Sequence, residues 1–88
     1  MVWTIRFDAK AEKELGRLSS IDRQRILKFL QQHVAPSENP RSIGDALAGP
    51  LSGFWHYRVG DYRVIVRMDD QAITVYVVRI GNRREVYR

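Results

Sequence analysis

The second half of this chain carries its positive charge as arginine, the side chain best suited to grip a phosphate group. All seven basic residues in the last forty positions are arginines, and every lysine lies in the first thirty. The seven are Arg58, Arg63, Arg67, Arg79, Arg83, Arg84 and Arg88. A guanidinium is a planar fork of five N–H donors that binds two phosphate oxygens at once, whereas a lysine ammonium is a mobile point charge. Because tyrosines are interleaved with these arginines, the pattern predicts a surface that holds a nucleic-acid backbone.

Two predicted strands place part of this arginine set on one face of a sheet. Residues 54–59 and 62–68 alternate in polarity, and the Gly-Asp pair at 60–61 between them is typical of a two-residue hairpin turn. With that turn, Arg58 lies directly across from Arg63. The opposite face of the same strands is apolar, and we expect it to pack against helices.

The predicted Arg58–Arg63 pair has no counter-ion in the hairpin. Like charges directly opposite each other destabilise a sheet by some tenths of a kcal/mol up to about 1 kcal/mol. The acidic residues nearest in sequence are badly placed, since Asp61 lies in the turn and Asp69 at the far end. We therefore expect a ligand to supply the counter-ion, and phosphate is the obvious anion. The alternative is a tolerated surface pair, because exposed arginines repel only weakly in water.

His56 lies on the predicted face of the arginine pair, and its side chain can move a proton near neutral pH. It is a candidate base, and the alternative is a structural histidine on a strand. Arg67 and Arg79 lie farther along the strands, and we expect them to have surface roles.

A basic tail of seven residues follows Gly81. Gly81 is expected to bend the chain and to fold Arg83 and Arg84 toward the arginine pair. Tyr87 is expected to stack on an unpaired base, with covering of the sheet edge as the alternative. Arg84 and Arg88 are predicted to contact RNA.

The side-chain pattern predicts a small α+β domain with the element order β-α-α-β-β-β. The expected elements are a strand over residues 2–7, helices over 9–18 and from about 20 to 34, and strands over 54–59, 62–68 and 72–80. Proline and glycine exclude regular structure over most of the segment between the second helix and the second strand. We expect the last three strands to form an antiparallel meander that the N-terminal strand joins, with both helices packed on one sheet face. Residues 1–88 are expected to form a single domain.

Each predicted helix has a capping residue and an apolar stripe. Asp8 can cap the first helix, and Ser20 or Asp22 can cap the second. The stripe of the second helix includes Leu30 and His33, so we expect His33 to be a buried, structural residue.

Composition limits the classes of partner and site. The chain has 15 Lys and Arg against 10 Asp and Glu, a net charge of +5, so a polyanion is the first partner to consider and an acidic protein the second. Cysteine is absent, which excludes a disulfide framework and a thiolate metal site and fits a reducing cytoplasm. The two histidines lie in distant segments, and we expect neither a metal nor another cofactor. The apolar stretches are too short to span a bilayer.

Two C-terminal motifs are specific when they occur together: WHYRVGDYRVI at residues 55–65 and IGNRREVYR at residues 80–88. They resemble the motifs of the RelE toxins of bacterial toxin–antitoxin pairs, and the similarity extends over essentially the whole chain. The resemblance implies a cytoplasmic endonuclease that cuts messenger RNA in the A site of the ribosome and is opposed by a cognate antitoxin. It also implies chemistry without a metal, in which the 2′-hydroxyl of the RNA attacks the adjacent phosphorus and leaves a 2′,3′-cyclic phosphate and a 5′-hydroxyl.

The resemblance assigns roles to five residues of this chain. It implies that Arg58 and Arg63 stabilise the phosphate and the transition state. Arg83 is implied as the proton donor or leaving-group stabiliser, and Tyr87 as the side chain that stacks on or orients the nucleotide. The base is implied to be His56, or Tyr87 as a phenolate, because arginine stays protonated.

The chain departs from the RelE pattern in places that bear on the chemistry. Well-studied RelE toxins have lysines where this chain has His56 and Arg58, and many have histidine where it has Asn82. No C-terminal helix is expected after Arg88. Two alternative functions remain open: a ParE-like toxin that inhibits gyrase without cutting RNA, and a module that binds nucleic acid without catalysis.

Overall fold

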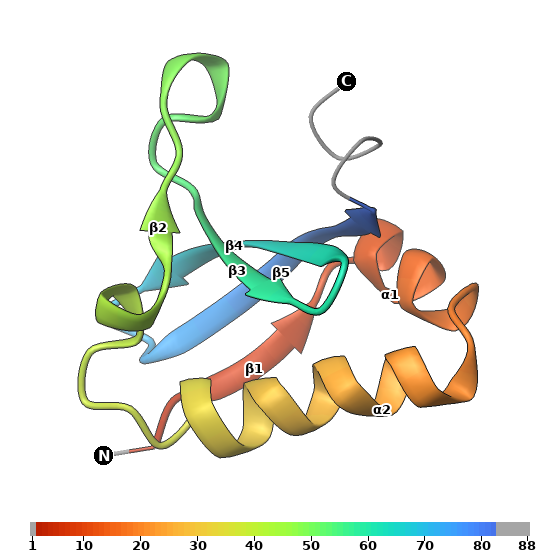
Figure 1. Ribbon diagram of the computed structural model, residues 1–88. Helices are drawn as coiled ribbons and strands as arrows, with labels where there is room; N and C mark the ends of the chain where they lie inside the picture. Colours follow the sequence, from red (N-terminus) through yellow and green to blue (C-terminus); the bar gives the residue numbers. More distant parts are fainter. Residues whose placement is uncertain (1, 83–88) are drawn as a thin grey trace.

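Five strands form one mixed sheet in the computed structural model, which describes residues 2–82 (Figure 1). The strands are β1 (Thr4–Phe7), β2 (Asp45–Ala46), β3 (Trp55–Val59), β4 (Tyr62–Asp69) and β5 (Thr74–Asn82). The helices are α1 (Ala9–Gly16) and α2 (Ser20–Phe29), followed by a π-helical turn η1 (Leu30–Val34) and two 3-10 turns, η2 (Pro40–Ile43) and η3 (Gly49–Leu51). The strand order is β1-β5-β4-β3-β2, with β1 parallel to β5 and the other neighbours antiparallel. The predicted α+β class and the meander of β3, β4 and β5 are confirmed.

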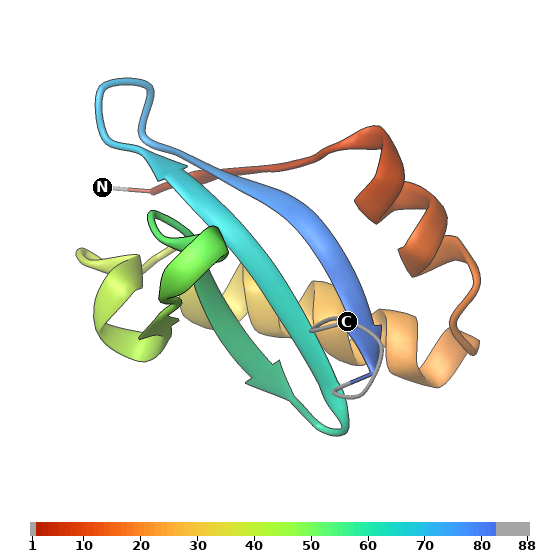
Figure 2. The ribbon, with the colours of Figure 1, turned by 90° about the horizontal axis from the view of Figure 1, so that it is seen from above.

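The sheet has an inner face that packs against the helices and an outer face that does not. The inner face carries the buried side chains Tyr57, Val64, Val66, Val75, Val77 and Ile80, which join Ala11, Leu15, Ile26, Leu30 and Val34 of the helical segments in one core. Figure 1 shows α2 beneath the sheet, and in Figure 2 α2 lies behind β3 and β4. The segment with β2 and η3 rises on the other side of the sheet (Figure 1). Within residues 2–82, no helix is long and apolar enough to cross a membrane.

The second helix differs from its prediction at both ends. Ser19 is its N-cap, with the hydroxyl oxygen accepting a hydrogen bond from the Asp22 N–H at 3.2 Å, so the predicted caps were one to three residues late. The C-terminal turn is π-helical, and the Ala35 N–H donates to the Leu30 carbonyl at 2.8 Å. This wider turn moves His33 out of the apolar stripe, and His33 is exposed rather than buried.

The hairpin turn between β3 and β4 sets the register as predicted. Gly60 has a φ of +59°, and Asp61 has no positive φ, the pattern of a type II′ turn. Val59 therefore pairs with Tyr62, and Arg58 pairs with Arg63.

One extra residue in β5 shifts its register against β4. Ile65 pairs with Arg79, but the next β4 residue, Val66, pairs with Val77, so Val78 is a bulge with no partner position of its own. The side-chain alternation of β5 reverses at this point. Without the bulge, strict alternation from buried Val77 would turn Arg79 toward the core.

The expectation that Gly81 bends the chain is wrong. Ile80 returns to the inner face and is only 2% exposed. Gly81 lies in β5 opposite Arg63 and does not bend the chain away, because β5 keeps its pairing with β4 as far as Asn82. A glycine at this position places no side chain beside Arg63.

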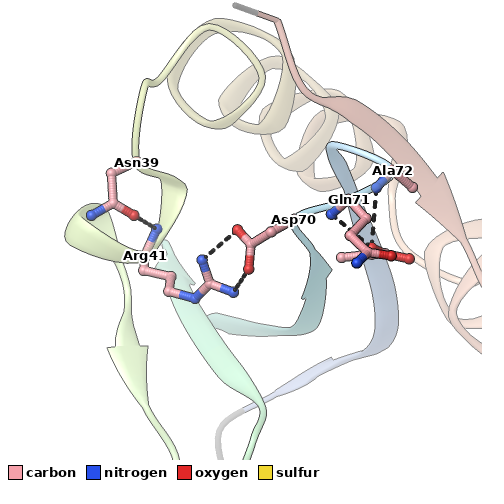
Figure 3. Close-up of polar contacts among 6 residues, drawn as sticks. Asn39, Arg41, Asp70, Gln71 and Ala72 are labelled. Carbon is pink, nitrogen blue, oxygen red and sulfur yellow. Dashed lines mark hydrogen bonds and ion pairs between the residues drawn. The ribbon is translucent and has the colours of Figure 1, made fainter.

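Two contacts hold the segment before β3 against the sheet. Arg41 donates to both carboxylate oxygens of Asp70 at 2.9 and 2.8 Å, and the Asn39 side chain caps η2 by accepting from the Arg41 N–H at 3.2 Å (Figure 3). The hydrogen bond from Arg41 lowers the pKa of the Asp70 carboxyl. The buried Tyr57 hydroxyl donates to the Pro40 carbonyl at 2.7 Å. These contacts fix the start of β2, in a segment that the sequence pattern predicted to lack strands.

Gly44 is required for this close approach, and we predict that Gly44→Ala destabilises the fold. A Cβ atom there would lie 2.9 Å from the His56 carbonyl oxygen and 2.9 Å from Tyr57 Cε1. The free energy of unfolding should fall by about 2 kcal/mol, the usual size of an overpacking penalty. Gly16→Ala is the matched control, since nothing lies within 4 Å of its added Cβ, and it should leave stability unchanged or raise it by up to ~1 kcal/mol. Urea denaturation of both variants measures the difference, and equal stabilities would contradict the packing at Gly44.

Candidate nucleic-acid interface

The outer face brings the predicted site residues of the hairpin together. Two neighbouring rows of cross-strand partners lie on it: Arg58, Arg63 and Gly81 in one, and His56, Ile65 and Arg79 in the next. The prediction that Arg58 and Arg63 are directly opposite each other is confirmed. Four cationic or titratable side chains, those of Arg58, Arg63, His56 and Arg79, thus share a small area of sheet.

Arg63 is buried, which the sequence did not predict. Its exposed fraction is 4%, whereas Arg58 beside it is exposed. Arg63 Nε is buried and has no hydrogen-bond partner within residues 2–82, and no carboxylate of that part of the chain lies within 4.0 Å of the guanidinium. A buried donor without a partner is costly, so this Nε is suited to an acceptor that comes from outside the described residues.

His56 lies beside the arginines in an environment that favours the neutral imidazole. Its side chain is 15% exposed, and burial lowers its pKa from the ordinary value of 6.5. The positive charges of Arg63 and Arg58 lower the pKa further, and the carboxylate of Asp45 opposes them. Asp45 Oδ2 lies 3.8 Å from His56 Nε2, because β2 pairs Asp45 with His56. A neutral imidazole at physiological pH can accept a proton.

Arg79 lies at the surface as expected, with its side chain 31% exposed, but it is anchored there by an ion pair. Glu14 of α1 accepts a hydrogen bond from Arg79 Nε at 3.3 Å and another from the Ile80 N–H at 3.0 Å. The pairing of β1 ends at Phe7 with Val77, so the β5 edge beyond it needs another acceptor. Glu14 supplies that acceptor from a position 66 residues away in sequence, which local patterns do not reveal.

Arg67 is exposed as predicted, but it has a specific neighbour. Its guanidinium carbon lies 4.1 Å from the centre of the Tyr76 ring, which is a cation–π contact. Tyr57 and Tyr62, by contrast, face the helices: Tyr57 belongs to the core, and the Tyr62 hydroxyl lies 3.2 Å from Asp22 Oδ2. The interleaved tyrosines of the sequence therefore do not form one surface.

The remaining predicted site residues, Arg83, Arg84, Tyr87 and Arg88, lie outside the described residues. Within residues 2–82, no three histidine, aspartate or glutamate side chains are grouped so that they could hold a metal ion.

Comparisons with known proteins agree on one superfamily of toxins. The model of the family described as the ParE toxin of the type II toxin–antitoxin system, parDE, matches residues 5–87. The toxin RelG of Mycobacterium tuberculosis is 31% identical over 88 residues, which cover 100% of this chain and 99% of that protein. The mRNA interferase toxin RelE of Escherichia coli is 32% identical over 90 residues, covering 99% of this chain and 92% of that one.

Solved structures give the same result for the fold. A toxin–antitoxin complex, RelBE, of Mycobacterium tuberculosis contains a chain that matches with a TM-score of 0.85 at 27% identity, covering 97% of this chain and 95% of the other. The isolated RelE toxin of Escherichia coli matches with a TM-score of 0.73 at 27% identity, covering 97% of this chain and 90% of the other.

We predict that the pKa of His56 lies below 6.5 and that Asp45→Asn lowers it further, because Asp45 is the group that raises it. NMR titration of the His56 ring measures both values. The folded pKa lies below that of the unfolded chain, so the unfolded state takes up more protons, and stability should decrease as the pH falls below about 6.5. A His56 pKa above 6.5, or a rise in Asp45→Asn, would contradict this environment.

We also predict that Glu14→Ala costs about 1–3 kcal/mol of stability, because it leaves the buried Ile80 N–H without an acceptor. Glu12→Ala in the same helix is the control; Glu12 is exposed near the helix N-terminus, and its loss should cost about 0.3–1 kcal/mol. Thermal unfolding of the two variants compares them, and a smaller loss for Glu14→Ala would rule out its role at the β5 edge.

Proposed function

This chain belongs to the ParE toxin family of type II toxin–antitoxin systems, and because it is also 32% identical to the mRNA interferase toxin RelE of Escherichia coli, we propose that it is a RelE-type endoribonuclease that cuts messenger RNA in the A site of the ribosome. The cut proceeds without a metal. The 2′-hydroxyl loses its proton to a base and attacks the adjacent phosphorus, the bond from phosphorus to the 5′-oxygen breaks, and that oxygen takes up a proton. The products are a 2′,3′-cyclic phosphate and a 5′-hydroxyl.

The observation that carries the proposal is the buried Arg63 next to Arg58, whose Nε has no hydrogen-bond partner within residues 2–82. The reacting phosphate gains negative charge as the 2′-oxygen attacks, and fixed cations aimed at that charge are the largest single contribution to many enzymatic rates. Arg63 Nε is a donor without a partner within residues 2–82, and such an oxygen would be an acceptor for it. Arg58, exposed and directly opposite, completes a two-cation site for one phosphate.

His56 is the proposed base. Its pKa is lowered, chiefly by burial, so that the imidazole is neutral and can take the proton of the 2′-hydroxyl. Arg83 is proposed to protonate or stabilise the leaving oxygen, and Tyr87 to stack on the nucleotide. Arg84 and Arg88 are proposed to bind the flanking RNA.

The second proposed partner is an antitoxin protein encoded with this chain. Related toxins have been solved in complex with RelB antitoxins from Escherichia coli and Mycobacterium tuberculosis. The net charge of +5 favours a partner segment with acidic side chains.

The test is a translation extract programmed with a defined message, to which the purified chain is added. We expect cleavage within codons positioned on the ribosome, with cyclic-phosphate ends. Arg63→Ala should slow cleavage about 10²–10³-fold, the effect of removing one transition-state donor. Tyr87→Phe and His56→Gln should also impair it. Arg17→Ala, which removes an exposed arginine at the end of α1, is the control for charge and should cleave normally.

The pH dependence adds a second test of the base. With His56 as base, the rate should rise as the pH increases through the lowered His56 pKa and then level off. An intact message together with gyrase-dependent DNA breaks would replace this proposal with the alternative of a ParE-like, gyrase-inhibiting toxin. Binding of RNA without any cut would leave a non-catalytic module.

A further inference from the structure

A pocket of about 400 Å³ opens on the outer face beside the arginine pair. Leu51 and Phe54, between β2 and β3, line it together with Asp8. The other lining residues belong to β4 and β5 and are Ile65, Arg67, Val78 and Arg79. The bulge brings Val78 and Arg79 onto the same face, so it builds this pocket as well as the row beside it.

We propose that this pocket binds one nucleobase of a single-stranded RNA, next to the nucleotide whose phosphate lies at Arg58 and Arg63. The inference rests on the proposed function and adds a base-binding subsite to it. Ile65, which lines the pocket, is two residues from Arg63 on the same face of β4, which is about 7 Å along the strand. Adjoining groups of one RNA strand can therefore occupy both places.

The wall of the pocket has the chemistry of a stacking surface. Phe54 and Leu51 are half-buried and apolar, yet neither belongs to the core cluster of the described residues nor packs against it. Large apolar side chains held over a sheet without core contacts keep an apolar surface available to a ligand. An aromatic ring in such a wall stacks on bases of any identity.

The rim of the pocket favours a base over an apolar protein side chain. Arg67 and Arg79 line the pocket, and each guanidinium has a neighbour that orients it: the Tyr76 ring for Arg67 and the Glu14 carboxylate for Arg79. Their N–H donors suit the acceptor atoms of a base edge and the phosphates on either side. Asp8 contributes the acidic side chain among the lining residues.

The first experiment maps the pocket with small probes on the full chain. Each of the four nucleoside monophosphates is titrated into ¹⁵N-labelled protein, with ribose 5-phosphate as the probe that lacks a base. We expect both kinds of probe to shift the signals of Arg58 and Arg63, and only the nucleotides to shift those of Phe54, Ile65 and Val78. Identical shifts for ribose 5-phosphate and the nucleotides would overturn the inference.

The second experiment couples one base to one side chain. A set of short oligonucleotides with 2′-O-methyl groups, which cannot be cleaved, carries an abasic site at each position in turn. One abasic position should weaken binding about tenfold, and Phe54→Leu should weaken binding of the intact strand to a similar extent, as expected for one base–aromatic stack. Combining the two changes should give no further loss.

Phe29→Leu is the matched control, since Phe29 is also half-buried but lies on the helix side, with its ring 5.6 Å from that of Tyr57. It should leave RNA binding unchanged.

Two outcomes of these measurements would overturn the inference. One is that the abasic site and Phe54→Leu weaken binding independently. The other is that a Phe54→Leu chain binds RNA normally but no longer binds the co-encoded antitoxin. Message cleavage without base-dependent shifts in the pocket defeats the inference alone, whereas such shifts without cleavage defeat only the proposed nuclease.

Discussion

The bulge at Val78 determines which side chains of β5 reach the outer face, and both parts of the candidate site depend on it. A strand alternates its side chains with a period of two, so one extra residue exchanges the faces of everything that follows. Here the exchange turns Arg79 outward, returns Ile80 to the core and leaves Gly81 in the row of Arg58 and Arg63. If β5 ran without the bulge, a charged guanidinium would enter the core and Ile80 would lie among the cations. Core packing at Ile80 and the outward position of Arg79 therefore favour the same register.

Both sides of the outer face are fixed by contacts between distant parts of the chain. On the β5 side, Glu14 completes the edge that β1 leaves open. On the β3 side, the bidentate Arg41–Asp70 pair and the Tyr57 hydroxyl hold the segment that leads to β2. Exposed ion pairs contribute little to stability on average, although bidentate geometry is the most favourable case. The value of Arg41–Asp70 lies more in position, since β2 places Asp45 beside His56.

The parts of the site whose geometry follows from local sequence rules could be predicted. The parts whose geometry depends on contacts between distant segments could not. A two-residue Gly-Asp turn fixes the register of its own hairpin, so the opposition of Arg58 and Arg63 followed from six residues of sequence. The burial of Arg63 depends on what covers the sheet, and no alternation pattern contains that information. The consecutive apolar pair Val77-Val78 was the one local sign of the bulge. The sequence pattern did not indicate the roles of Asp45 and Glu14. Asp45 reaches His56, and Glu14 reaches Arg79, only in the folded chain.

Under the proposed function, the two arginines that bind the phosphate also influence the pKa of the base. Burial is the main cause that lowers the pKa of His56 in the free protein, and the positive charges of the two arginines add to it. A bound phosphate offsets those charges, so the Coulombic contribution that lowered the pKa weakens when the substrate arrives. The proton affinity of His56 then rises at the step in which it must take a proton from the 2′-hydroxyl. A lysine in place of His56 would carry its own charge near the arginines, and it would need a far larger pKa shift to act as a base at neutral pH. The histidine at this position is therefore consistent with a site whose fixed cations are both arginines.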